Sequence, residues 1–164
     1  MARTTDAGIV TALAIATLLG NVAAAQTAST LKNLPPAVAK AVQDNRPGAE
    51  IDKLTVEKEQ GITFYDFEFK AGQGEMDVAA DGTVLDVATV IGMNDLPEVV
   101  AATIRKEARK RRITQLTRSE VRAEIVSEGG KARVSRLAAP RYVYEAEFSS
   151  GEIEVAADGK IIKK

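Results

Sequence analysis

Strict alternation of apolar and polar residues marks two stretches of the chain. Residues 65–69 read Tyr-Asp-Phe-Glu-Phe, and residues 144–148 read Tyr-Glu-Ala-Glu-Phe. After a short gap, each stretch is followed by a second alternating one, at residues 75–79 and 152–156. A period of two places successive side chains on opposite faces of a β-strand. The pattern therefore predicts an antiparallel pair of strands that occurs twice.

A helix and a turn accompany each pair of strands. The segments 33–36, Asn-Leu-Pro-Pro, and 95–98, Asp-Leu-Pro-Glu, both begin runs in which apolar residues recur at helical spacing. Asn33 and Asp95 are predicted N-caps, and proline is tolerated in the first turn of a helix. The dipeptide Asp-Gly follows each second strand, at Asp81 and Asp158, and strongly favours a hairpin turn.

These elements predict an α+β fold of two tandem units, each with one helix packed on a roughly four-stranded antiparallel sheet. The units are placed at residues 33–90 and 95–164. The second unit has a lengthened hairpin around residues 118–140, with turn residues at its centre. The apolar strand positions should face the helices, and the other face of each sheet is expected in solvent. Whether the two sheets are continuous is open at this point.

The first 25 residues have the organisation of a secretory signal peptide. Arg3 precedes an apolar run from Gly8 to Leu19, and Ala23-Ala24-Ala25 provides small residues for cleavage. The run is too short to span a bilayer. We therefore expect cleavage near Ala25, a loose lead over residues 26–32, a periplasmic or secreted mature protein, and no transmembrane segment in it.

Composition argues against several functions. The chain contains no histidine and no cysteine, so the commonest general base and the commonest zinc ligands are missing. Neither a Gly-x-Ser-x-Gly nor a Gly-x-Gly-x-x-Gly motif occurs. A net charge of −1 does not favour nucleic-acid binding. The sequence therefore predicts a protein that is not an enzyme and carries no cofactor.

Carboxylates fill the polar positions of the alternating strands. If the strands pair as the pattern implies, four share one side in each unit, and like charges that face each other across strands destabilise a sheet. One interpretation is a solvated face flanked by Lys53, Lys58 and the arginines of the long hairpin. The other is a divalent cation such as calcium, although spacing along a strand does not close the acids around one point. The residues are Asp66, Glu68, Glu75, Asp77, Glu145, Glu147, Glu152 and Glu154.

Several short motifs resemble the PepSY-like family, also called beta-lactamase-inhibitor-like. Besides Leu-Pro at each helix start, Ile-x-x-Leu-Thr occurs at residues 51–55 and 113–117, and Glu-x-x-Val-x-x-Asp-Gly at 75–82 and 152–159. The motifs cover nearly the whole mature chain, and they consist mostly of strand and turn positions. The resemblance implies two such units in tandem and an inhibitory or regulatory role exerted by binding another protein.

The sequence thus predicts an exported binding module, acting on an envelope or secreted protein through its outer sheet face and long hairpin. Inhibition of a beta-lactamase itself is not expected, because most aromatic residues are assigned to the core. The alternative is a sensor of divalent cations or small ligands that uses the acidic face. Oligomeric state is not predicted. The candidate partner-binding residues are Phe64, Gly129, Gly130, Arg133, Arg136 and Tyr142.

Overall fold

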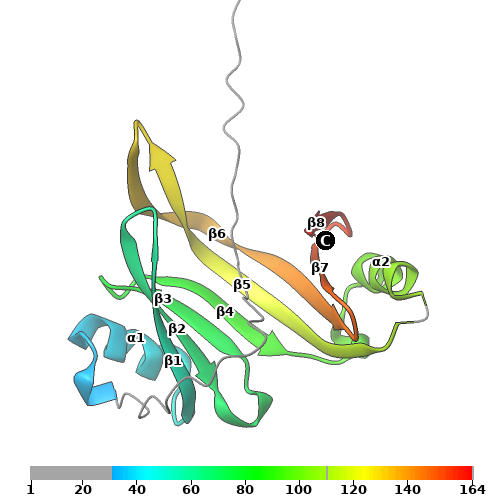
Figure 1. Cartoon of the computed structure of the whole chain (residues 1–164), viewed down its shortest axis with the longest axis horizontal. Coiled ribbons are helices and arrows are strands. Elements are labelled where there is room, and N and C mark those ends of the chain that lie inside the picture. Colours follow the sequence, from blue (N-terminus) through cyan, green and yellow to red (C-terminus); the bar gives the residue numbers. More distant parts are fainter. Residues whose placement is uncertain (1–30, 110, 164) are drawn as a thin grey trace, which may run out of the picture.

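The computed structural model describes residues 31–109 and 111–163, which form two α-helices and one antiparallel sheet (Figure 1). The helices are α1 (Pro36–Asn45) and α2 (Glu98–Ala108). The strands follow the chain in sheet order: β1 (Ile51–Glu59), β2 (Ile62–Phe69), β3 (Glu75–Ala79), β4 (Val84–Val90), β5 (Ile113–Glu128), β6 (Lys131–Phe148), β7 (Glu152–Ala156) and β8 (Ile161–Lys163).

The two groups of four strands form one continuous sheet. β4 pairs with β5 through Ala88 with Ser119, Thr89 with Arg118 and Val90 with Thr117. The predicted α+β class and the order of one helix before four strands agree with the structure. The sequence leaves open whether the two sheets are continuous, and the structure joins them edge to edge through this short ladder.

Both helices pack on the same face of the sheet, at opposite ends of the long axis of the molecule (Figure 1). α1 covers a core centred on Phe67 and Val78, and α2 covers a second core centred on Ala146 and Val155. The strand positions predicted to face the helices lie in these two cores. No helix in the described part of the chain is long and apolar enough to cross a membrane.

The predicted N-caps are wrong. α1 begins after Pro35 with no side-chain cap, and Asn33 lies in a preceding 3-10 turn, Leu31–Asn33. α2 likewise begins after Pro97, while the Asp95 carboxylate accepts a hydrogen bond from the Gly92 amide at 2.8 Å. In both cases an extended proline, Pro35 or Pro97, occupies the cap position, two residues after the polar residue that was predicted to cap the helix.

The sheet is strongly curved. Backbone positions of β2 and β6 come within 8 Å although three strands separate them in sheet order. The face opposite the helices is the one predicted above as the outer sheet face. Because the sheet curves around it, we call it the inner face from here on. Side chains from five strands form a third apolar cluster on this face. Its members are Phe64, Ala79, Leu85, Ala123, Ile125 and Val134. The distal part of the β5–β6 hairpin therefore bends over the inner face of the first four strands.

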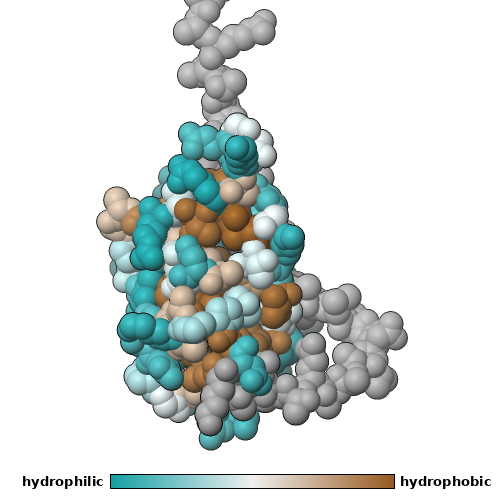
Figure 2. Space-filling model, turned by 90° about the vertical axis from the view of Figure 1, so that its left-hand side faces the viewer, coloured by the Kyte–Doolittle hydropathy of each residue, from teal (hydrophilic) through white to brown (hydrophobic). Residues whose placement is uncertain are grey.

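Irregular backbone allows this bend. Between the pairs Val121 with Arg141 and Ala123 with Arg136, β6 carries extra residues, 137–140, which include Pro140. A bulge of this kind bends a strand and increases its twist. The turn of the hairpin is formed by Gly129 and Gly130, both with positive φ. Figure 2 faces the end of the molecule where α1 and the tips of the β1–β2 and β5–β6 hairpins lie. It shows apolar atoms in a band between hydrophilic side chains.

The β3–β4 turn requires glycine at position 82 for two reasons. Gly82 has a φ of +85°, and a Cβ there would lie 2.8 Å from both Cβ and O of Ala37 in α1. Gly61 has a similar φ of +92° but open space around it. Gly82→Ala is therefore expected to lower the free energy of unfolding by about 2–3 kcal/mol, and Gly61→Ala by about 1 kcal/mol, because only the first adds a steric clash to the backbone strain. Urea unfolding of the two variants tests this, and equal losses would contradict the close packing of the turn on α1.

Candidate functional site

Carboxylates stand directly opposite one another on the inner face. As predicted, the strand register places the four carboxylates of each half on one side of the sheet. The cross-strand pairs are Asp66 with Asp77, Glu68 with Glu75, Glu145 with Glu154, and Glu147 with Glu152. Asp86 of β4 extends the row, because it lies opposite Asp77. We call these residues together the acidic cluster.

The acidic cluster is not the fully solvated face that the alternation predicts. Glu145, Glu154 and Asp86 are buried, and the other members are partly buried. Curvature is the physical reason, since it brings the inner-face side chains toward one another and removes water from between them. The third apolar cluster occupies the same face at the end where the long hairpin bends over.

Burial and mutual repulsion raise the pKa values of several members. Burial, followed by the nearby charges of Asp66 and Asp86, raises the pKa of Asp77 to about 8. Burial and then Glu152 raise the pKa of Glu145 to about 8. The pKa of Glu75 rises to about 7, again chiefly through burial. Desolvation disfavours the charged form, so much of this face holds protons near neutral pH.

The two halves of the acidic cluster act on one another. Glu147 contributes to the raised pKa of Glu75, and Glu75 contributes to that of Glu145. The strands that separate them present the short side chains Ala88 and Thr117 at the corresponding positions. Because the β4–β5 ladder joins the halves and the sheet curves, two sets of carboxyl groups that are distant in sequence form one cluster of interacting acids.

Cations compensate this charge at one edge. Lys53 Nζ lies 2.5 Å from Glu68 Oε1, as the sequence suggested, and it is an exposed ion pair. The arginines of the long hairpin do not play the expected part. Arg133 pairs with Glu128 at the hairpin tip, and Arg141 pairs with Glu124.

A metal centre is not supported by the arrangement. Among the residues that the structure describes, no group of three or more acidic side chains is placed to hold a metal ion. The carboxylates follow the strands as opposed pairs, whereas calcium needs six to eight oxygen ligands around one point. The calcium alternative therefore lacks a geometric basis.

The predicted partner-binding residues do not form one patch. Gly129, Gly130 and Arg133 lie exposed at the tip of the long hairpin. Phe64, predicted as an exposed contact, belongs instead to the third apolar cluster. Tyr142 is on the helix side of the sheet, where it is 39% exposed and lies beneath the Arg118 guanidinium at 5.7 Å. Arg136 is far from the tip and donates a hydrogen bond to Thr83 Oγ1 at 3.1 Å.

The architecture defines the class of the protein: an α+β fold in which two helices cover one face of a curved, eight-stranded antiparallel sheet. A solved structure of a protein from Bacteroides eggerthii, described as periplasmic, has this fold with a TM-score of 0.54. The two chains are 11% identical, and the match covers 79% of this chain and 86% of that one. This likeness concerns the fold alone.

Two further solved structures are similar over comparable lengths. A DUF2874 family protein from Bacteroides ovatus is 11% identical, with a TM-score of 0.48 and coverage of 79% of this chain and 85% of that one. A BLIP-like protein from Bacteroides fragilis is 15% identical, with a TM-score of 0.45 and coverage of 78% and 83%. No protein-family model and no curated protein matches the chain. The assignment to the PepSY-like family and the tandem repeat remain predictions.

The raised pKa values give stability a definite pH dependence. The folded protein binds more protons than the unfolded chain between the ordinary carboxylate pKa of about 4 and the raised values, so the free energy of unfolding falls as pH rises through this window. Asp77→Asn removes the charge while it keeps the shape. It is expected to stabilise the protein by about 1–2 kcal/mol at pH 8 and by much less at pH 5, where Asp77 is already protonated.

Chemical unfolding at both pH values measures this difference. Asp52→Asn, at an exposed position of β1, makes the same chemical change outside the acidic cluster and provides the control. If the two variants respond equally to pH, then the burial of Asp77 does not govern the effect.

Proposed function

We propose that the protein is an exported, non-enzymatic module that binds a basic segment of another protein on its inner face. The observation that carries the proposal is the acidic cluster, in which carboxylates from β2, β3, β4, β6 and β7 converge on one curved surface. The desolvation of these groups is already part of the folded state. A cationic side chain that enters the face displaces protons from these carboxyl groups and then faces carboxylates that have already lost much of their water, whereas an exposed carboxylate would first have to lose it.

The inner face also specifies an order of side chains in its partner. One end carries the third apolar cluster beneath the bent hairpin, and the other carries the carboxylates. A segment with apolar residues followed by lysine or arginine complements both ends at once. Figure 2 shows apolar surface at the end of the molecule that includes the hairpin tip, where such a segment would enter.

Export and regulation complete the proposal. The signal-like sequence at residues 1–25 supports a periplasmic or secreted location, and the Bacteroides eggerthii protein of similar fold is described as periplasmic. Those first residues lie outside the described part of the structure. Within the envelope, occupation of the inner face by a basic segment would inhibit or regulate the partner that carries the segment. The family resemblance implies the same kind of role.

Titration calorimetry with defined peptides tests the proposal. We expect peptides that combine apolar residues with lysine or arginine to bind, and peptides of the same composition with glutamate in place of the basic residues not to bind. Affinity should fall as salt rises, since salt screens the charges. At pH 9, where both carboxylates are ionised, the double variant Glu75→Gln/Glu145→Gln removes one negative charge from each half and should weaken binding at least about tenfold.

The matched control is Asp52→Asn/Glu98→Gln, which removes two exposed carboxylates outside the acidic cluster. It should bind as the unchanged protein does. If both double variants lose peptide affinity equally, then the net charge of the protein explains the loss, and a role of the inner face is contradicted. Absence of binding by every basic peptide would contradict the proposal as a whole. A thermal midpoint that rises with calcium would instead favour the cation-sensor alternative, because a ligand of the native state raises stability.

A further inference from the structure

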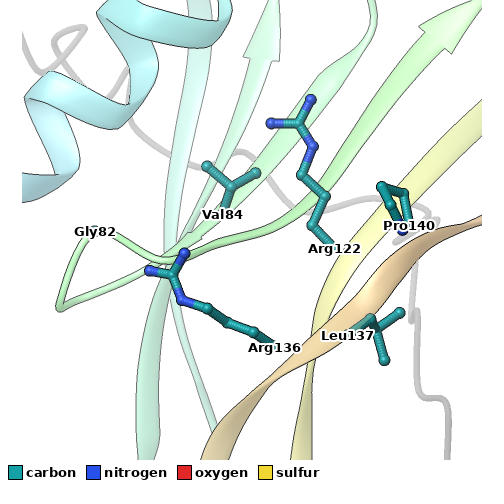
Figure 3. A pocket seen from close by; sticks show the side chains of 6 residues that line it. All are labelled: Gly82, Val84, Arg122, Arg136, Leu137 and Pro140. Carbon is teal, nitrogen blue, oxygen red and sulfur yellow. The ribbon is translucent and has the colours of Figure 1, made fainter.

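A pocket of about 290 Å³ opens where β4 and β5 separate. The two strands pair only through residues 88–90 of β4 and 117–119 of β5, so they diverge toward the β3–β4 turn and leave a gap between that turn and the bend of β6. Figure 3 shows the side chains that line it. They are Gly82, Val84, Arg122, Arg136, Leu137 and Pro140.

Two arginines from neighbouring strands line this pocket. The Arg136 side chain extends from β6 toward the β3–β4 turn, whereas the Arg122 guanidinium on β5 points away from that turn and toward the end of α1 (Figure 3). Arg122 donates to Glu120 at 2.7 Å and to Asn45 at 2.5 Å, and Arg136 donates to Thr83 Oγ1. A guanidinium carries five N–H donors, so these contacts leave donors on both groups for a ligand.

Three arginines, Arg46, Arg122 and Arg136, lie in or near the pocket. Burial and the positive charge of Arg122 lower the pKa of Arg46, which follows α1. Arg46 donates to the Ala88 carbonyl, and its Nε is buried without a hydrogen-bond partner. The nearby acids are Asp81 of the β3–β4 turn, which accepts from the Thr83 amide, Glu120, which is held by Arg122, and Asp86. Among the described residues, Arg136 has no acidic partner within ion-pair distance.

We propose that this pocket binds a small organic carboxylate with a short branched apolar chain. The planar guanidinium of Arg136 matches a carboxylate geometrically and can hold both of its oxygens. Val84, Leu137 and Pro140 provide apolar walls for the rest of the molecule. The volume, at the lower end for ligand sites, suits a ligand of this size. An inorganic phosphate fits less well, because it has no apolar part to contact Val84, Leu137 and Pro140.

This site lies beside the third apolar cluster, because Arg136 is opposite Ala123 in the β5–β6 register, and its ligand would act on the long hairpin. Arg136 lies on the part of β6 that bends over the sheet, while Thr83 and Gly82 belong to the β3–β4 turn. A carboxylate held between them ties the hairpin to the first half of the molecule. Binding would therefore favour the bent position of the hairpin over the third apolar cluster.

Two-dimensional amide NMR of the full chain tests the proposal with three probes: isovalerate, isovaleramide and inorganic phosphate. Isovalerate is expected to shift the resonances of Gly82, Val84 and Leu137 with a dissociation constant of about 1–10 mM, typical of so small a ligand. The neutral amide has the same shape without the charge and should cause no such shifts. Arg136→Gln should weaken isovalerate binding at least about tenfold, because it removes the unpaired cation.

Arg133→Gln on the same strand is the matched control, since it removes an arginine at the hairpin tip outside the pocket. It should leave isovalerate binding unchanged. Arg133 and Arg136 are both exposed, so loss of folding is not expected in either variant. An amide spectrum of each variant without ligand is the check on folding. The proposal is overturned if isovalerate causes no shifts in the pocket, if the amide causes equal ones, or if Arg136→Gln binds as before. Stronger binding of phosphate than of isovalerate also overturns the assignment to carboxylates.

Discussion

The structure depends on the pairing of β4 with β5. Three residue pairs, Ala88 with Ser119, Thr89 with Arg118 and Val90 with Thr117, turn two groups of four strands into one sheet. Each group has its own helix and its own core, and the two cores share no residue. The ladder nevertheless decides the shape of the molecule, because it brings both groups of carboxylates to the same face. It also leaves the gap beside Val84, since the strands diverge where the pairing ends.

Local features of the fold could be predicted from the sequence, whereas its curvature could not. Alternation around Phe67 and Ala146 identifies the strands and the side that the helices cover, because a period of two is a local property. The bend of the long hairpin depends instead on the extra residues near Pro140 and on the third apolar cluster, in which Phe64 meets hairpin residues that are remote in sequence. The cap predictions failed because in each motif a proline, Pro35 or Pro97, occupies the cap position instead of the polar residue.

The candidate site was predicted in its members but not in its environment. The register confirms the opposed carboxylates, yet burial makes them different groups from the solvated acids that alternation suggests. Asp86 was missed because β4 does not alternate cleanly, and its opposition to Asp77 could have been found from the register alone. A surface that keeps several partly protonated carboxylates together lowers the stability of its own fold. Such a cost is common where a surface serves recognition, since the groups that bind best are those that the folded protein satisfies least.

The bent hairpin makes the inner face a joint property of both halves of the chain. Ile125 and Val134 come from the second half, but they cover Phe64 and Ala79 of the first. Sequence drift in one half is therefore constrained by the other: a bulkier residue in β2 must be accommodated by a smaller one in the hairpin, or the sheet opens. Although each half has a complete core, the two cannot evolve independently, and neither could be exchanged for its counterpart from a related chain without changing the surface that the pair displays.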